Sequence, residues 1–507
     1  MLRSLRTDMR RRQDYVPAAV ETGSVGSHVA SGGLWTGVGL LAVTLIGLVR
    51  SMVYARLLPP AAFGVLNLAN VFTQFILLFS NFGFTSSIVY WRKLGRLDLA
   101  TCWWGNLMVD AGAALLCVVF AFTGTRWSDR PETQWIIVLL AMQFLIVSVG
   151  SINAALMRRQ FLFRPTAMSQ IAAAVVTFAA GWILIAVFDA GAYGLVGGVI
   201  AGTIAQVLFN FAYMPWLPSF SFSWANLREH ADYGRWFLGV NVVTYANQNI
   251  DRVLIGTRLS STQLGYYEYA SSLPLQLTVQ MGTLLNSVLF PAFASLQDDL
   301  VELRRVLLKV MRSSAFILYP FLAGLALTAT DVVRVAYGEA WMPIVWPTRA
   351  FCLFGMVRVM TNPAYSLCNG VGKPALPFKW SLIALPLNWV VIWLGVWTGD
   401  VTTVAVTAIF LPAFMLLTLV AEVSKHIGMP VRQICAAVLP ALLCCLIMAA
   451  AVLGLKTLPF VDALNPLSRL VAQAIVGGAV YTGSMRLFYG EHFAAMVRLV
   501  CRVLPRS

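Results

Sequence analysis

Apolar stretches of membrane-spanning length recur along the chain and are separated by short polar segments. A run of about 20 apolar residues is long enough to cross the hydrocarbon core of a bilayer as a helix. The pattern predicts about fourteen such helices, at 32–55, 61–90, 99–123, 134–156, 166–188, 191–215, 234–257, 265–290, 313–336, 344–368, 376–398, 402–423, 433–455 and 467–489. No polar stretch is long enough for a soluble domain. The chain is therefore predicted to be an all-α polytopic membrane protein.

The basic residues between the apolar runs indicate how the chain is oriented. If the N-terminus is cytoplasmic, most of the 36 Lys and Arg residues fall in cytoplasmic segments. The positive-inside rule then places both termini in the cytoplasm, which requires an even number of spans. Residues 1–26 are rich in arginine but have no apolar core, so they are not a signal peptide. They are predicted to be a basic cytoplasmic tail or an amphipathic surface anchor.

The composition is typical of a membrane protein and does not indicate a nucleic-acid-binding or metal-binding protein. Hydrophobic residues make up 59% of the chain and charged residues 11%. The net charge of +15 does not indicate nucleic acid, because the basic residues lie between apolar runs. The eight cysteines form no CxxC pair or other ligand spacing, so neither a metal nor another cofactor is predicted.

An internal repeat relates the first and seventh runs and the helices that follow them. Three pairs of identical residues are separated by 201 positions: Trp35 and Trp236, Gly64 and Gly265, Ala69 and Ala270. An even separation of six spans gives both copies the same orientation in the membrane. Transporters built from such parallel repeats bind their substrate between the halves. The repeat predicts a tail (1–26), a six-helix bundle (27–216), a linker loop (217–233), a second six-helix bundle (234–424), two further helices (425–490) and a C-terminal tail (491–507).

Four segments resemble a known family: 56–64 (RLLPPAAFG), 249–256 (NIDRVLIG) with 264–267 (LGYY), 290–291 (FP) and 337–341 (YGEAW). In their order and spacing they are similar to the polysaccharide-transporter branch of the MOP superfamily, which holds the Wzx-type flippases and the lipopolysaccharide and exopolysaccharide exporters. The resemblance covers residues 27 to 490.

The resemblance implies two six-helix bundles around a central cavity, with two additional C-terminal helices. It implies that the chain flips an undecaprenyl-diphosphate-linked oligosaccharide, an O-antigen or exopolysaccharide repeat unit, across the bacterial inner membrane by alternating access. Its partners would be that lipid-linked oligosaccharide, membrane lipids, and polysaccharide polymerase or export machinery. No enzymatic activity is expected, on the residues considered below.

Charged residues inside apolar runs are expensive in a bilayer and are therefore candidate site residues. Arg50 and Asp251 occupy equivalent positions in the repeat. They are predicted to bind substrate and to form a gate that pairs when closed. The alternative is that Asp251 pairs with its neighbour Arg252 or caps a loop.

Arg358 is predicted to contact the lipid diphosphate, because a guanidinium group binds phosphate oxygens in a bidentate manner. The alternative is a structural ion pair with Asp331 or Glu268. Asp110, Glu268 and Glu422 are candidates for coupling to a proton or a cation, with helix packing as the alternative for Glu268 and Glu422.

Polar residues recur at helical spacing in several runs and indicate a wet face suited to sugar hydroxyls. The candidate substrate-binding residues are Asn70 and Gln74 in the second run, Asn241, Thr244, Gln248 and Asp251 in the seventh, and Gln276 and Gln280 in the eighth. The alternative is hydrogen bonding between helices, which favours the same residue types. The glycine-rich segment 194–202 predicts close helix packing.

Two other functions compete with glycolipid transport. An ion-coupled drug or metabolite exporter of the same superfamily would share the fold and the cavity, but the predicted cavity arginines favour an anionic head group. A membrane glycan-processing enzyme would need catalytic groups in a reaction cavity. The four histidines are not clustered with carboxylates, and no GxxxxGK[ST] motif is present.

Overall fold

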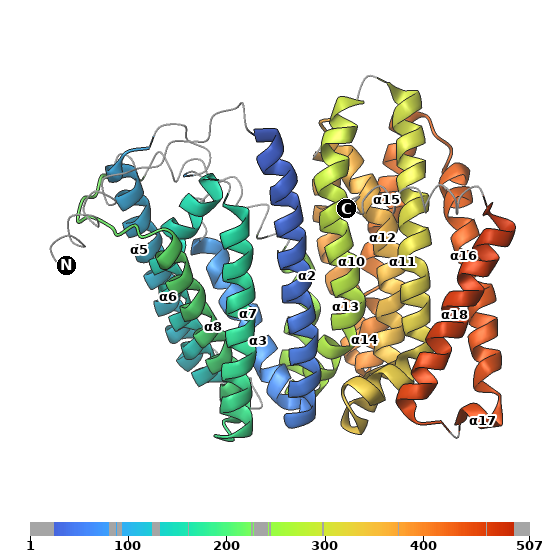
Figure 1. Cartoon of the computed structure of the whole chain (residues 1–507), viewed down its shortest axis with the longest axis horizontal. Coiled ribbons are helices and arrows are strands. Elements are labelled where there is room, and N and C mark those ends of the chain that lie inside the picture. Colours follow the sequence, from blue (N-terminus) through green and yellow to red (C-terminus); the bar gives the residue numbers. More distant parts are fainter. Residues whose placement is uncertain are drawn as a thin grey trace. The chain divides into compact units, whose positions relative to one another are not determined.

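The computed structural model describes residues 25–80, 88, 94–123, 132–160, 162–224, 227, 242, 245–296, 299–373, 375–462 and 464–490. These residues are overwhelmingly α-helical (Figure 1). Eleven helices in the described part are long and apolar enough to cross a membrane. This confirms the prediction of an all-α, multi-pass membrane protein. Two more helices, α10 and α18, also have spanning length, with 35 and 23 residues.

Two compact units, residues 1–265 and 266–507, make up the chain. The first unit contains α2 (Val25–Leu57), α3 (Pro60–Ser80), α5 (Arg96–Thr123), α6 (Glu132–Arg159), α7 (Phe163–Ala186), α8 (Gly191–Tyr213), a helix of residues 245–258 and the start of α10 (Ser261–Ser295). The second contains the rest of α10, α11 (Leu300–Ala336), η3 (Glu339–Ile344), α12 (Val345–Gly370), α13 (Ala375–Trp397), α14 (Val401–Thr407), α15 (Phe410–Ile427), α16 (Val431–Lys456), α17 (Pro459–Asp462) and α18 (Pro466–Phe488). The bounds predicted for the six-helix bundles stay a prediction.

The twelfth predicted run, 402–423, is divided into two helices, α14 and α15. Pro412 has no backbone N–H, so the carbonyl of Ala408, four residues earlier, cannot receive its helical hydrogen bond. Residues 408–409 between them keep right-handed helical backbone angles, and Val401–Lys425 as a whole is long and apolar enough to cross a membrane. The predicted run is therefore confirmed as one span, with a local change in helical hydrogen bonding that hydropathy does not reveal.

Glycines on α8 allow its backbone to lie directly on α7. A Cβ atom on Gly198 would come within 2.7 Å of the Thr177 carbonyl oxygen, and one on Gly202 within 2.7 Å of the Ala173 carbonyl oxygen. Small residues of this kind let membrane helices approach closely and gain van der Waals contact. The close packing predicted from the glycine-rich segment is therefore confirmed.

The starts of α3 and α10 meet through residues that the 201-residue offset relates. A Cβ atom on Gly64 would overlap the backbone carbonyl of Ser261, and one on Gly265 would overlap that of Pro60. Pro60 and Ser261 are themselves separated by the same offset as the two glycines. The two copies of the repeat therefore pack on each other reciprocally. Each glycine lies against the backbone of the first residue of the other helix.

The helix of residues 245–258 packs antiparallel to α3 inside the first unit. The Tyr245 hydroxyl donates a hydrogen bond of 2.7 Å to the Val71 carbonyl. Further along, Gly256 lies against the Leu68 side chain. These contacts hold the described part of the seventh predicted run against the second.

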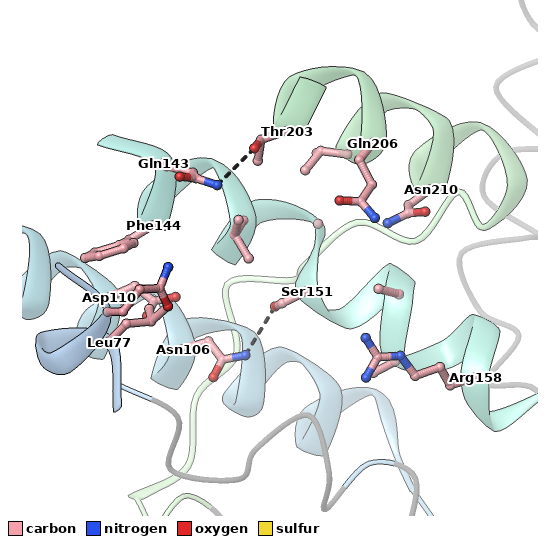
Figure 2. Close-up of a pocket in the computed structure, with 16 residues that line it drawn as sticks. Leu77, Asn106, Asp110, Gln143, Phe144, Ser151, Arg158, Thr203, Gln206 and Asn210 are labelled. Atoms are coloured by element: carbon pink, nitrogen blue, oxygen red, sulfur yellow. Dashed lines mark hydrogen bonds between the residues drawn. The ribbon is translucent and has the colours of Figure 1, made fainter. Parts of the chain in front are cut away.

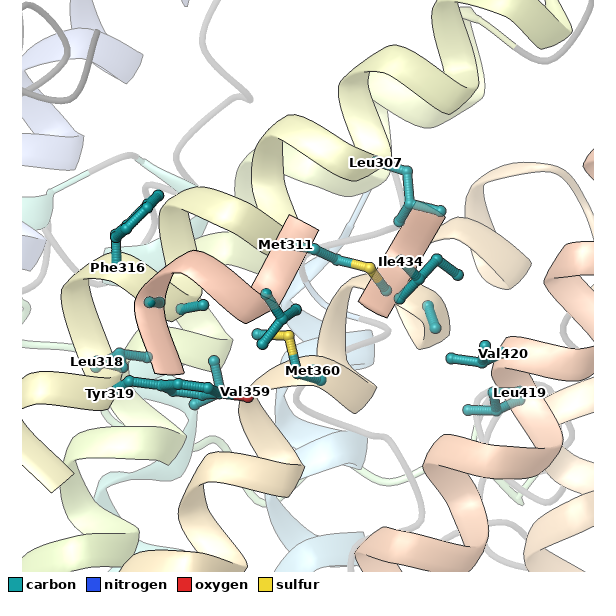
Figure 3. Packing of buried hydrophobic residues seen from close by; sticks show 14 of the residues in the cluster. Leu307, Met311, Phe316, Leu318, Tyr319, Val359, Met360, Leu419, Val420 and Ile434 are labelled. Atoms are coloured by element: carbon teal, nitrogen blue, oxygen red, sulfur yellow. The ribbon is translucent and has the colours of Figure 1, made fainter. Parts of the chain in front are cut away.

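The core of the second unit is a continuous apolar cluster built from α11, α12, α15, α16 and α18 (Figure 3). Pro320 lies inside α11 and has no backbone N–H to donate to the Phe316 carbonyl, four residues earlier. The buried hydroxyl of Tyr481 on α18 donates to that carbonyl at 2.9 Å. A tyrosine on one helix thus compensates for a proline in another, which ties α18 to α11.

We expect Tyr481→Phe to lower the thermal unfolding midpoint of the detergent-purified protein. The change removes a buried hydrogen bond between α18 and α11, which is worth about 0.5–1.5 kcal/mol. The matched control is Tyr213→Phe, because Tyr213 is exposed and its hydroxyl donates to no described residue. Equal midpoints for the two variants would show that the bond to Phe316 contributes nothing.

Candidate functional site

A polar cavity of about 360 Å³ lies within the first unit, enclosed by α3, α5, α6 and α8 (Figure 2). This volume is at the lower end of the range for small-molecule pockets, about 300–1,000 Å³. The polar residues that line it are Gln74, Asn106, Asp110, Gln143, Ser151, Arg158, Thr203, Gln206 and Asn210. Each of the four helices is otherwise strongly apolar. The cavity is therefore a polar space within a bundle of otherwise apolar helices.

Part of this polar lining is fixed by hydrogen bonds between neighbouring helices. The Asn106 amide donates to the Ser151 hydroxyl at 3.2 Å. The Gln143 amide donates to the Thr203 hydroxyl, also at 3.2 Å. These pairs join α5 to α6 and α6 to α8, and they satisfy groups that are costly to leave unpaired in hydrocarbon.

Other lining groups remain available to a ligand. Gln74 on α3, Gln206 on α8 and Arg158 on α6 form no hydrogen bond or ion pair with any described residue. Gln74 and Arg158 are exposed, and Gln206 is half-buried. Two amides and one guanidinium group of the lining therefore have no bonding partner among the described residues.

The two charged residues of the described lining are separated from each other. Asp110 accepts a hydrogen bond from the Ser148 hydroxyl, whereas Arg158 lies near the end of α6, at the opposite side of the cavity (Figure 2). They do not neutralise each other. The cavity thus has an acidic end and a basic end, with amides and hydroxyls between them.

This arrangement suits a ligand with many hydroxyl groups and one anionic group. Amides and hydroxyls both donate and accept hydrogen bonds, as a sugar requires. A guanidinium group pairs with phosphate oxygens through two parallel bonds. Among the described residues, no three His, Cys, Asp or Glu side chains are placed to hold a metal ion.

Gln74 and Asp110 are the predicted site residues that the structure brings together in this cavity. Sequence reasoning missed the others on α5, α6 and α8. On α8, Thr203, Gln206 and Asn210 follow the spacing i, i+3, i+7. That is the same helical signal that marked the second and seventh runs, so a search of the sixth run would have found them.

Arg50 and Asp251, the predicted gate, are not paired in this structure. Arg50 forms no hydrogen bond or ion pair with a described residue. One carboxylate oxygen of Asp251 accepts from the backbone N–H of Arg252 at 2.9 Å. The Arg252 guanidinium donates instead to the Gln248 carbonyl and to Asn249. The gate concerns a closed state and stays a prediction.

Arg358 lies half-buried in the middle of α12 without an ion pair to a described residue. Its guanidinium carbon is 6.0 Å from the centre of the Phe354 ring. Asp331, one of its alternative partners, instead accepts from Gln473 and faces Arg469. A structural pair between Arg358 and Asp331 is therefore absent, and the diphosphate contact of Arg358 stays a prediction.

The remaining predicted residues do not line the cavity. Asn70 is half-buried on α3, Gln248 is exposed on the helix of residues 245–258, and Gln276, Gln280 and Glu268 are half-buried on α10. Glu422 is half-buried on α15, within electrostatic range of Cys368. Asn241 and Thr244 lie outside the described residues.

The sequence and the fold are similar to those of known membrane proteins. The chain is 25% identical to the lipopolysaccharide biosynthesis protein WzxC of Escherichia coli strain K12, over 71% of this chain and 73% of WzxC. Its fold is similar to that of the lipid II flippase MurJ in an inward closed conformation, with a TM-score of 0.71 and 15% identity, covering 90% of this chain and 99% of the MurJ chain.

An inward-facing multidrug resistance transporter of the MATE family, in the MOP superfamily, is also similar, with a TM-score of 0.61 and 13% identity, covering 76% of this chain and 94% of the transporter. At these identities the two solved structures indicate the fold alone. Residues 53–346, more than half of the chain, match the family described as polysaccharide biosynthesis protein, and the chain belongs to that family.

Proposed function

We propose that this protein moves an oligosaccharide linked to a polyprenyl diphosphate from the inner to the outer leaflet of the bacterial inner membrane. It acts as a transporter and not as an enzyme. Membership of the polysaccharide biosynthesis family supports the substrate class. WzxC, a lipopolysaccharide biosynthesis protein, supports it further.

The polar cavity of the first unit is the observation that carries this proposal. The MATE likeness means that the fold is compatible with drug export as well. The lining distinguishes the two functions, because amides and hydroxyls suit sugar hydroxyls better than they suit a lipophilic drug. Arg158 favours an anionic substrate over a cationic one.

The cavity chemistry suggests how one end of the substrate is held. A sugar in the cavity would bond to the amides of Gln74 and Gln206, which have no partner among the described residues. The diphosphate would approach Arg158 at the end of α6, which the distribution of basic residues places toward the cytoplasm. We also propose that Arg358 contacts the substrate at a later step of transport. A gate between Arg50 and Asp251 would act at a later step as well. Contact with polymerase or export machinery is also part of the proposal.

The direct test is flipping in proteoliposomes that contain the purified protein and a polyprenyl-diphosphate oligosaccharide with a fluorescent sugar. Movement is read as the fraction of label that a membrane-impermeant reductant can quench. We expect the fluorescent sugar to become accessible to the reductant faster than it does in protein-free vesicles. Transport of a lipophilic cation, without movement of the glycolipid, would replace this proposal with drug export.

We further propose that Asp110 couples transport to a proton or cation gradient. Of the three candidate acids, Asp110 lines the cavity, whereas Glu268 and Glu422 do not. Asp110→Asn is expected to remove the acceleration of flipping by a proton or sodium gradient, measured as the ratio of the rates with and without the gradient. Glu422→Gln is the matched control, because Glu422 does not line the cavity. A gradient effect that survives in Asp110→Asn but disappears in Glu422→Gln would transfer the role to Glu422.

A further inference from the structure

A second group of charged residues lies in the second unit, where α11, α12, α16 and α18 come together near α17 (Figure 1). Asp331 is near the end of α11, Arg349 is in the second turn of α12, Lys456 ends α16, and Arg469 is in the first turn of α18. The orientation predicted from the basic loops puts this end on the outer side of the membrane. This cluster does not belong to the cavity described above.

Asp331 is the buried centre of this group, with 3% of its surface exposed. One of its carboxylate oxygens accepts from the Gln473 amide at 2.9 Å. The other lies 3.9 Å from the Arg469 guanidinium group. Asp331 thus interacts with two side chains of α18, which explains why a carboxylate is tolerated at this buried position.

Arg349 and Lys456 are held differently. The Lys456 ammonium donates to the Leu327 carbonyl at 2.6 Å, and the Arg349 guanidinium donates to the Ala326 carbonyl at 3.2 Å. These carbonyls belong to successive residues of α11, so the two cationic groups are brought to the same stretch of helix. Neither cation forms an ion pair with a described residue. Most of their N–H donors are therefore left for another partner.

The charges of the group do not balance among the described side chains. Lys456 lies within electrostatic range of Arg349, Arg469 and Asp331, which makes three cations around one carboxylate. Like charges at the edge of a low-dielectric region repel each other more strongly than they do in water. An anion that binds between Arg349 and Lys456 would relieve this repulsion.

The membrane itself supplies anions at this depth. The Arg349 guanidinium carbon stacks 4.5 Å from the ring centre of Trp346, which is 65% exposed. Tryptophan side chains gather at the level of lipid head groups, and basic pockets between membrane helices bind head-group phosphates. We propose that Arg349 and Lys456 form a binding site for the phosphate of a lipid head group, separate from the transport cavity.

The test measures the thermal unfolding midpoint of the detergent-purified full chain as dioleoyl phosphatidylglycerol is added. The lipid should raise the midpoint of the wild-type protein, because a ligand that binds the folded state stabilises it. In Arg349→Gln/Lys456→Gln, the lipid concentration that gives half of the shift should rise at least about tenfold, the effect of losing one charge-assisted contact.

Two control variants separate a lipid site from a general charge effect. Arg305→Gln/Arg432→Gln removes two cations from the opposite ends of α11 and α16, where Arg305 is 72% exposed and pairs with Glu302. This variant should keep the wild-type lipid response. Lys456→Arg, which retains the charge, should keep most of it. Because each shift is measured relative to the same variant without lipid, a loss of basal stability does not mimic the effect.

The source of the phosphate is distinguished by repeating the titration with a polyprenyl-diphosphate oligosaccharide. A response to phosphatidylglycerol assigns the site to a membrane phospholipid, and a response to the diphosphate alone assigns it to the transported lipid. If the wild-type protein responds to neither, or if Arg349→Gln/Lys456→Gln responds as the wild type does, the two cations only bond to α11 carbonyls and the proposal is wrong. The outcome does not depend on whether the protein flips glycolipid.

Discussion

Replacement of Gly64 by alanine should produce the largest loss of stability among single substitutions of small residues in the first unit. The added Cβ atom would overlap the backbone carbonyl of Ser261. A backbone atom cannot move aside as a flexible side chain can, so the starts of α3 and α10 must separate. Overpacking typically costs about 1–3 kcal/mol, and a backbone clash belongs at the upper end of that range. The measurement is the thermal unfolding midpoint together with the yield of monodisperse protein in detergent.

Gly112→Ala on α5 is the matched control, since a Cβ atom there meets no other atom within 4 Å. That change should be neutral or slightly stabilising, because alanine favours a helix over glycine. Gly265→Ala should resemble Gly64→Ala, because its Cβ atom would overlap the carbonyl of the equivalent residue, Pro60. Equal midpoints for Gly64→Ala and Gly112→Ala would show that the reciprocal contact does not exist in the folded protein.

Hydropathy predicted the helices well because the membrane fixes their length. The run 166–188 corresponds to α7 (Phe163–Ala186), and the run 433–455 to α16 (Val431–Lys456). The local change in hydrogen bonding between α14 and α15 was not predicted, because it depends on a missing N–H at Pro412 and not on polarity. The 201-residue offset found the equivalent glycines but gave no sign that they contact each other.

The cavity was harder to predict, because the same polar side chains can face water or another helix. Asn210 illustrates this ambiguity: it lines the cavity and also accepts a hydrogen bond from the Ser169 hydroxyl at 2.9 Å. Gln206, one turn before it, has no such partner among the described residues. Spacing along one helix identifies a polar face but not what lies opposite, which depends on how α5, α6 and α8 pack.

The adjacent arginines at the end of α6 carry the second prediction. Arg159 is 5% exposed and donates a 2.6 Å hydrogen bond to the Ile88 carbonyl. Arg158 is exposed, lines the cavity and has no partner among the described residues. Two neighbouring residues of the same type therefore have different expected roles, one in folding and one in binding.

Arg158→Gln should lower glycolipid flipping roughly ten- to hundredfold, which corresponds to the loss of charge-assisted hydrogen bonds worth about 1.5–3 kcal/mol. Its unfolding midpoint should match that of the wild-type protein. Arg159→Gln should instead lower the midpoint, because the Ile88 carbonyl loses its donor. Arg158→Lys keeps the charge but loses the bidentate geometry, so an intermediate flipping rate is expected. A normal flipping rate for Arg158→Gln would remove Arg158 from the substrate path and leave Arg358 as the candidate for diphosphate binding.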